Sequence, residues 1–172
     1  MKIPFVARLV SVVLVLGLVA CAADEERLSS LYFAERVGGP FAASQIMVLE
    51  TDGGPARQLT STADADNDEP DLSPDGTLVA FASKRDFPPP TGGWVQNPTL
   101  RMIYLMNSDG TNQRRLTTNS LAACSEHNPR FSPDGRWIVF DMSCDDVAPS
   151  SISRLYRVRV DGSGQELSLI HI

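Results

Sequence analysis

The stretch Ser73-Pro74-Asp75-Gly76 lies in the middle of the chain, and the same four residues return at Ser132-Pro133-Asp134-Gly135. Proline sets φ near the value that the second position of a type I turn requires, aspartate suits the third position, and glycine accepts the positive φ that follows. One copy alone would predict only a tight reversal between two strands. Two copies with similar surroundings predict a structural repeat.

The similarity extends on both sides of these turns. Each copy starts with a proline, Pro70 or Pro129, and continues into an apolar run that ends in Phe81 or Phe140. Three more features then follow in both copies. A second apolar run lies at 103–106 and 155–158, and an Asp-Gly pair lies at 109–110 and 161–162. A Leu-Thr pair at 116–117 and a Leu-Ser pair at 167–168 come last. Residues 31–60 form a partial copy that lacks only the Pro-x-x-Ser-Pro-Asp-Gly segment.

Each full copy predicts four short antiparallel strands joined as a meander. The strand that ends in phenylalanine is apolar at nearly every position, at 78–82 and 137–140, whereas a strand with one exposed face would alternate. We therefore expect these sheets to be covered on both faces. Small four-stranded sheets stacked face to face, at a period of about 50–60 residues, are typical of a β-propeller.

The repeat resembles that of TolB-type propellers, a WD-repeat-like family. The likeness covers residues 30–167 and rests on Pro-x-x-Ser-Pro-Asp-Gly, on Ile-Tyr-x-Met-Asn-x-Asp-Gly at 103–110 and on Arg-Leu-Thr at 115–117. The family also has Ser-x-Arg-Asp after the phenylalanine strand, which residues 83–86 keep and residues 143–146 lack. The resemblance implies an all-β propeller fragment whose ring is not closed. Its three blades are expected at 31–60, 70–117 and 129–167, the first without its innermost strand.

The N-terminus resembles that of a bacterial lipoprotein precursor. A short basic start precedes an apolar run at 9–20, which is too short to span a bilayer, since that needs about 20 residues. The run ends in Leu18-Val19-Ala20-Cys21, which is similar to a lipobox. We expect a signal peptide at 1–20, lipidation of Cys21 and a tether at 21–30. The alternatives are a plain secretory signal and an uncleaved anchor.

The lipid on the cysteine would hold the protein to a membrane, which predicts a cell-envelope location, at the outer membrane facing the periplasm or the cell surface. Without the signal peptide the net charge falls from −6 to −8, because two basic residues are removed. An acidic surface argues against a nucleic-acid partner, since phosphate contacts need lysine and arginine. Gly-x-Ser-x-Gly, His-Glu-x-x-His and P-loop patterns are missing from the sequence, so neither an enzyme nor a cofactor is expected.

The expected function is therefore that of a scaffold module that binds an envelope protein or a glycan. The alternative is the N-terminal propeller of a serine hydrolase of the prolyl-oligopeptidase or dipeptidyl-peptidase type, with its catalytic domain encoded beyond residue 172.

Three blades cannot close a ring, since propellers typically have four to eight. At this period a complete one would need roughly 300–400 residues, so we expect a fragment of a longer protein that is a monomer when full length. Residues 168–172 belong to a final hexapeptide that resembles the translation of a sequencing adapter. This tail is therefore expected to be non-native, and a short natural tail is the alternative.

A meander places alternate connections at opposite ends of a sheet. The Ser-Pro-Asp-Gly and Asp-Gly turns share one end, and the long connections share the other: 36–44, 61–69, 84–100, 118–128 and 143–153. Binding residues usually lie on long loops held by a rigid scaffold, so we expect a partner at the end with the long loops. The candidate residues are Arg85, Phe87 and Trp94 in one loop and Asp64, Asp66 and Asp68 in another.

These candidates have alternatives. Trp94, in a stiff proline-rich loop, would otherwise pack on the neighbouring blade. The alternating carboxylates at 64–69 resemble a calcium loop, but Glu69 stands where an EF-type loop needs glycine, and no glutamate follows at the right distance. A solvated acidic loop without a metal is therefore favoured. His127 has no partner constellation and is expected to be structural.

Cys124 and Cys144 form an even pair once Cys21 is lipidated, and disulfides persist in exported proteins. If Ser132 faces Trp137 across the turn, the numbers of paired residues sum to about 269–270. That register places residue 126 near residue 144, with Cys124 just beyond the end of its strand. We expect a disulfide between the two cysteines, and the alternative is two free, buried thiols.

Overall fold

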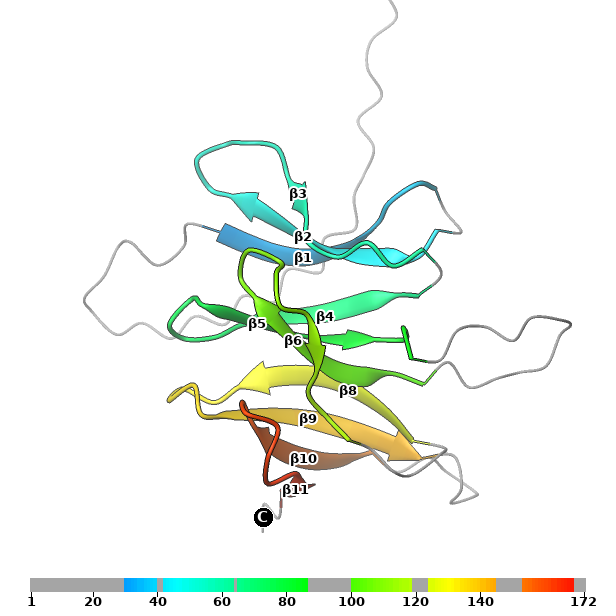
Figure 1. Ribbon diagram of the computed structural model, residues 1–172, viewed down its shortest axis with the longest axis vertical. Helices are drawn as coiled ribbons and strands as arrows, with labels where there is room; N and C mark the ends of the chain where they lie inside the picture. The colour runs from blue at the N-terminus through cyan, green and yellow to red at the C-terminus, as the bar shows by residue number, and fades with distance from the viewer. Residues whose placement is uncertain are drawn as a thin grey trace, which may run out of the picture.

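The computed structural model describes residues 30–39, 42–63, 65–86, 100–118, 124–144 and 153–168. This part of the chain forms three antiparallel sheets, called blades one to three from here on, which are stacked on one another (Figure 1). Blade one contains β1 (Ser30–Arg36), β2 (Ser44–Glu50) and β3 (Arg57–Gln58). Blade two contains β4 (Asn67–Leu72), β5 (Leu78–Ser83), β6 (Met102–Asn107) and β7 (Arg114–Arg115). Blade three contains β8 (Cys124–Phe131), β9 (Trp137–Cys144), β10 (Arg154–Arg159) and β11 (Glu166–Leu167).

This arrangement confirms the all-β, unclosed propeller that the repeat predicts. Within each sheet the strands follow one another in chain order, as a meander requires. In the described residues, blade one has the three later strands of the repeat and no strand on the free edge of β1. In the same part of the chain there is no helix long and apolar enough to cross a membrane.

The Ser-Pro-Asp-Gly turn has the same hydrogen bonds in both copies. The Ser73 hydroxyl donates to the Asp75 carboxylate (2.6 Å) and accepts the backbone N–H of Leu78 (2.9 Å), and the Gly76 N–H donates to the Ser73 carbonyl (2.8 Å). The corresponding distances in the second copy are 2.6, 3.0 and 2.8 Å. Hydrogen bonds from Ser73 and Thr77 lower the pKa of Asp75. The repeated motif is therefore a turn with a structural role.

The first strands of blades two and three begin earlier than the repeat predicts. β4 starts at Asn67 and β8 at Cys124, so the ends of the expected loops 61–69 and 118–128 are strand, and the prediction is wrong there. Each of these strands contains a proline, Pro70 or Pro129, which has no backbone N–H to donate to the neighbouring strand. A β-bulge in the strand accommodates it. The residue before each proline, Glu69 or Asn128, takes a positive φ of 59° or 51°, and the strand continues on the other side.

Two apolar layers hold the three blades together. The layer between blades one and two contains Ile46, Val48, Leu59, Val79, Phe81, Met102, Tyr104 and Met106. The layer between blades two and three contains Ala80, Ala82, Ile103, Leu105, Leu116, Cys124, Ile138, Phe140, Met142 and Val158. β5 contributes to both layers, as its unbroken apolar sequence predicts. The same prediction is wrong for β9, where buried and partly exposed residues alternate, because no sheet of the described residues covers its second face.

The Asp-Gly turn of each later blade packs on the leucine of the preceding Leu-Thr pair. Gly110 lies so close to Leu59 that a Cβ there would be 3.1 Å from the Leu59 carbonyl oxygen. Gly162 has the same relation to Leu116, at 3.4 Å. The guanidinium of Arg57 also donates to the carbonyl of the turn residue Asp109 (3.0 Å). Both repeated dipeptides therefore join one blade to the next.

Candidate functional site

The long connections leave the three sheets at a common end. The pairing registers place Arg36 opposite Ser44 at this end of blade one, and Asn67 opposite Ser83 in blade two. The Ser-Pro-Asp-Gly turns close the other end, where Leu72 pairs with Val79 and Phe131 with Ile138. We call the first of these the long-loop end, and it is the end that the sequence predicts to bind a partner.

Asp66 lies at the base of the long-loop end, immediately before β4. Its carboxylate accepts hydrogen bonds from the backbone N–H of Ser44 (3.0 Å) and from Nζ of Lys84 (2.6 Å). Burial acts to raise the pKa of Asp66, but Lys84 and Ser44 outweigh that effect and lower the pKa to about 2. The ionised Asp66 therefore ties the start of β2 in blade one to the end of β5 in blade two.

Asp68 continues this network from within β4. Its carboxylate accepts the Ser44 hydroxyl and a hydrogen bond from Nη2 of Arg101 (3.1 Å). Nη1 of Arg101 lies 3.5 Å from Nδ1 of His127 in β8, and that nitrogen lies 3.7 Å from Oε1 of Glu69. We call these six side chains the inner polar cluster: Asp66, Asp68, Glu69, Lys84, Arg101 and His127.

These contacts correct the expectation of a solvated acidic loop. Burial acts to raise the pKa of Glu69, but His127 and the backbone N–H of Asn128 (2.8 Å) outweigh it and lower that pKa. The described carboxylates of the loop each face a basic side chain. His127 links blades two and three, in agreement with a structural role. Within the described residues, no group of three or more His, Cys, Asp and Glu side chains is placed to hold a metal ion.

Arg85, from the Ser-x-Arg-Asp pattern, lies over two aromatic rings of blade two. Its guanidinium carbon is 4.5 Å from the ring centroid of Tyr104 and 5.3 Å from that of Phe81. Nη2 donates to Oδ1 of Asn67 (2.8 Å), and Nη1 donates to Oε1 of Gln113 (2.9 Å). Burial lowers the pKa of Arg85. These contacts hold the base of the following loop, and a contact of Arg85 with a partner stays a prediction.

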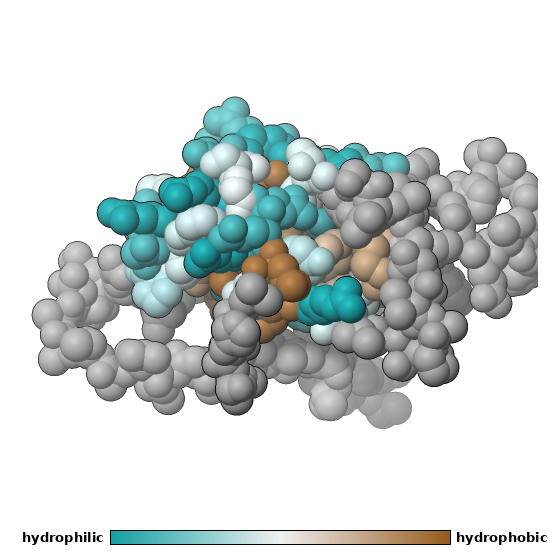
Figure 2. All heavy atoms as spheres, turned by 90° about the horizontal axis from the view of Figure 1, so that it is seen from below, coloured by the Kyte–Doolittle hydropathy of each residue, from teal (hydrophilic) through white to brown (hydrophobic). Residues whose placement is uncertain are grey.

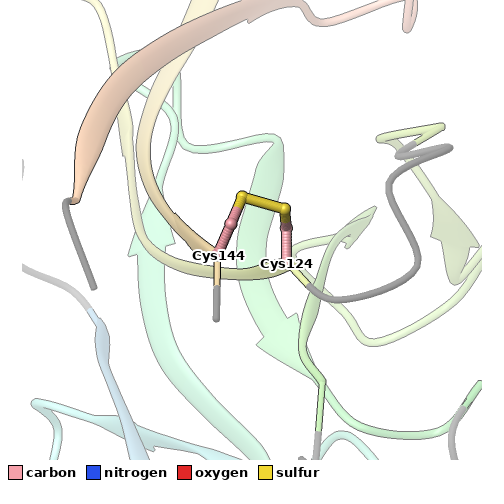
Figure 3. The surroundings of a disulfide bond; sticks show 2 residues. All are labelled: Cys124 and Cys144. Atoms are coloured by element: carbon pink, nitrogen blue, oxygen red, sulfur yellow. A yellow bond between two sulfur atoms is a disulfide. The ribbon is translucent and has the colours of Figure 1, made fainter. Parts of the chain in front are cut away.

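Blade three has a disulfide at the same place. The strand registers align Met142 with Ser83, so Cys144 is the counterpart of Arg85, and it is bonded to Cys124 (Figure 3). The two cysteines are direct neighbours across β8 and β9, and Cys124 is fully buried. The expected register is wrong by one to two residues, since Glu126 faces Met142 instead of lying near residue 144. The bulge at Asn128 causes this shift, and it brings Cys124 into the strand.

A shallow hollow of about 210 Å³ opens on blade one at the long-loop end. Its walls come from the connection between β1 and β2, from β2 and β3 themselves and from the segment after β3: Val37, Ala42, Ala43, Gln45, Gln58, Ser61, Thr62 and Ala63. Ligand pockets usually measure about 300–1,000 Å³, so the hollow suits a protruding side chain better than an enclosed small molecule.

The structure brings together part of the predicted site. It places five of the candidate residues at the long-loop end: Asp66, Asp68, Arg85, Cys124 and Cys144. Four others lie outside the described residues: Cys21, Asp64, Phe87 and Trp94. Sequence reasoning missed Ser44, Lys84 and Arg101. Lys84 could have been found from its place inside Ser-x-Arg-Asp, whereas the other two stand at strand ends without a pattern.

Comparison with known proteins shows what the fold is similar to. No model of a protein family matches the chain. An uncharacterised protein of Agrobacterium fabrum is 29% identical over 150 residues, which cover 69% of this chain and 48% of that protein. A TolB structure from Agrobacterium tumefaciens has a TM-score of 0.63 at 26% identity, over 81% of this chain and 44% of that chain. TolB from Acinetobacter baumannii has a TM-score of 0.53 at 19% identity, over 81% and 29%.

Enzymes are also among the similar propellers. Oligogalacturonate lyase from Vibrio parahaemolyticus has a TM-score of 0.54 at 17% identity, over 82% of this chain and 34% of that chain. Such a low identity shows the fold alone. The chain spans about half the length of the relatives it matches first. The three described sheets are therefore blades of an incomplete β-propeller like that of TolB.

Proposed function

We propose that the chain is the propeller part of a cell-envelope lipoprotein, and that its long-loop end binds a protein or glycan partner. One observation carries this proposal: the long connections leave one end of a scaffold whose strand ends are held by the inner polar cluster and by the Cys124–Cys144 disulfide. Loops on rigid bases are where binding residues are usually found, and a preorganised surface loses less entropy on binding. The likeness to TolB structures supports the envelope location.

The chemistry of the inner polar cluster favours recognition over catalysis. Asp66 faces Lys84 at 2.6 Å, and Asp68 faces Arg101 at 3.1 Å, so each carboxylate is held by a basic side chain in a fixed position. A general acid or base needs a pKa near the working pH, and a carboxylate with a pKa of about 2 does not meet that need. We therefore propose that the inner polar cluster holds the bases of the loops in place.

Binding can be tested with isolated peptidoglycan sacculi and with detergent-solubilised envelope proteins as the two probes. The double variant Phe87→Ala/Trp94→Ala removes the aromatic side chains of the longest loop, and we expect it to reduce retention at least tenfold on one of the two probes. Arg136→Ala is the matched control, because Arg136 is exposed at the opposite end of blade three, and it should bind like the wild type. Equal retention of the double variant, or no retention of the wild type on either probe, would contradict the proposal.

The membrane anchor has a separate test. Intact-mass measurement of protein from the membrane fraction should show cleavage before Cys21 and the added mass of acyl chains. Ala22 follows the cysteine, so in a Gram-negative host we expect the lipoprotein in the outer membrane. Cys21→Ala protein that stays in the membrane fraction at the original level would rule out the lipid anchor.

The serine-hydrolase alternative and the binding module predict different coding sequences after the last blade. A Gly-x-Ser-x-Gly pattern encoded after the last blade would support it, whereas a stop codon after further blades would support the binding module. Sequencing the locus beyond codon 172 distinguishes the two.

A further inference from the structure

One titratable side chain of the inner polar cluster, His127 in β8, lies where blade three meets blade two. Figure 2 views the molecule from the end where β10 and β11 lie, and it shows an apolar area bordered by hydrophilic side chains. The side of blade three that packs on blade two is apolar as well, but His127 adds a polar contact at the long-loop end. Its side chain is only 22% exposed, and histidine changes its charge between about pH 5 and pH 8. A change of charge at this place therefore acts on the contact between two blades.

A single ring nitrogen of His127 faces two groups of opposite charge. Its Nδ1 lies 3.5 Å from Nη1 of Arg101 and 3.7 Å from Oε1 of Glu69. A guanidinium can only donate, so a hydrogen bond from Arg101 needs a neutral ring whose Nδ1 carries no proton. An ionised carboxylate can only accept, so a hydrogen bond to Glu69 needs a proton on Nδ1. The two contacts therefore exclude each other, and a ring that takes up a proton on Nδ1 exchanges the first contact for the second.

The carboxylate of Glu69 is already bound to the next residue of β8. Its Oε2 accepts the backbone N–H of Asn128 at 2.8 Å. Glu69 and Asn128 have the same place in their blades, directly before Pro70 and Pro129, and both have a positive φ, which is uncommon outside glycine. The pKa of Glu69 lies below its ordinary value, so its carboxylate stays ionised over the range in which histidine titrates. A protonated His127 gives this carboxylate a second donor from β8, directly beside the first.

The other charged groups around β8 have partners of their own. Asp68 in β4 faces Nη2 of Arg101 at 3.1 Å, so Arg101 keeps a partner in blade two when it loses the contact with His127. Asp141 lies opposite His127 in β9, and its Oδ1 accepts a hydrogen bond from Nδ2 of Asn128 at 2.8 Å. The remaining contacts of this kind are those of Lys84 with Asp66, Arg130 with Asp71, Arg115 with Asp86 and Glu126 with Thr117. Among the described residues, the contacts that change with the charge of His127 are therefore those with Arg101 and Glu69.

We propose that His127 is a proton-operated link between blades two and three. The neutral ring joins β8 to Arg101, which lies directly before β6. The protonated ring releases Arg101 to Asp68 and joins Glu69, so that Glu69 holds the bulge of β8 at two adjacent residues instead of one. Mild acid thus tightens the contact between the first strands of the two blades. This inference concerns the scaffold itself and does not depend on the proposed partner binding.

A proton NMR titration of the full chain tests the two neighbours of the ring. The sequence has only two histidines, so His171→Gln leaves the imidazole of His127 as the single signal to follow. In that background Glu69→Gln removes the negative neighbour and should lower the pH midpoint of the titration, whereas Arg101→Gln removes the positive neighbour and should raise it. Each shift should be on the order of 0.5 pH unit, because these side chains are partly exposed. Glu50→Gln is the matched control, since Glu50 is exposed in blade one, and it should leave the midpoint unchanged.

Hydrogen exchange tests whether the proton changes the contact between the blades. After correction for the intrinsic effect of pH, the backbone N–H of Asn128 in the wild type should be about 1.5 to 5 times better protected at pH 5 than at pH 8, as a partly exposed ion pair provides. His127→Gln has no proton to take up, so its protection should be the same at both pH values. Equal protection of the wild type at the two pH values, or a difference that persists in His127→Gln, would overturn the proposal. A titration midpoint that Glu69→Gln leaves unchanged would overturn it as well.

Discussion

Thr117, which follows the short outer strand of blade two, donates the hydrogen of its hydroxyl to the carboxylate of Glu126 in β8. The backbone N–H of Ile103 donates to the same carboxylate oxygen (3.1 Å). The Thr117 hydroxyl also accepts the N–H of Ile103 (3.2 Å), and one blade earlier the Thr60 hydroxyl accepts the N–H of Ile46 (2.9 Å) in the same way. The threonine of the repeated Leu-Thr pair therefore satisfies buried polar groups where two blades meet.

The first prediction concerns Thr117→Val. The variant keeps the shape of the side chain but removes one of the two donors to the fully buried Glu126 carboxylate, and the loss of a hydrogen-bond partner by a buried group costs about 1–3 kcal/mol. Urea denaturation should show that loss of unfolding free energy. Thr118→Val is the control, since Thr118 is exposed and the change should stay within about 0.5 kcal/mol. Equal effects of the two variants would show that the bond to Glu126 contributes nothing.

The second prediction concerns the pH dependence of Glu126→Gln. Burial raises the pKa of Glu126, although Thr117 and the Ile103 N–H act to lower it. A carboxyl with a raised pKa in the folded state contributes stability below its unfolded pKa and loses that contribution as the pH rises through the folded pKa. The unfolding free energy of the wild type, relative to that of the variant, should therefore fall as the pH is raised from 4.5, the ordinary pKa of glutamate, towards neutral pH. A difference in unfolding free energy between the two proteins that stays constant over this pH range, or that grows in favour of the wild type, would contradict the prediction.

The third prediction compares Gly110→Ala with Gly76→Ala. Both glycines have a positive φ, 92° and 74°, so both variants suffer the same kind of backbone strain, roughly 1–2 kcal/mol. Only Gly110 also lacks room for a Cβ, because Leu59 of the preceding blade lies 3.1 Å away. Gly110→Ala should therefore lower the melting temperature further than Gly76→Ala. Equal shifts would mean that the two blades separate slightly at little cost.

The fourth prediction concerns the disulfide. Cys124 and Cys144 enclose a loop of about 20 residues, and the chain-entropy estimate for such a loop is roughly 3 kcal/mol. Cys124→Ala/Cys144→Ala should lose stability of that order. Non-reducing peptide mapping of the exported protein should give a linked peptide that contains both cysteines. Complete alkylation of both thiols without reductant would show that the bond does not form.

The sequence by itself determined the class of fold and the repeat, because these depend on local chemistry. A proline, an aspartate and a glycine in fixed order define a turn wherever they occur, and unbroken apolar runs need cover on both faces. The same reasoning placed Cys124 and Cys144 on one hairpin, and it located the long connections at one end.

Only the tertiary structure decided which side chains meet between strands and between blades. Arg101 and Asp68 are 33 residues apart in the sequence, and Ser44 and Asp66 are 22 residues apart. No local sequence pattern therefore predicts either contact. The bulges at Glu69 and Asn128 shift the register behind them, which is why Cys124 lies within β8 and Asp68 within β4. The acidic segment is thus a set of fixed ion pairs, because strand pairing within blade two brings Lys84 and Arg101 to it and the stacking of blade three brings His127, and both depend on the folded chain as a whole.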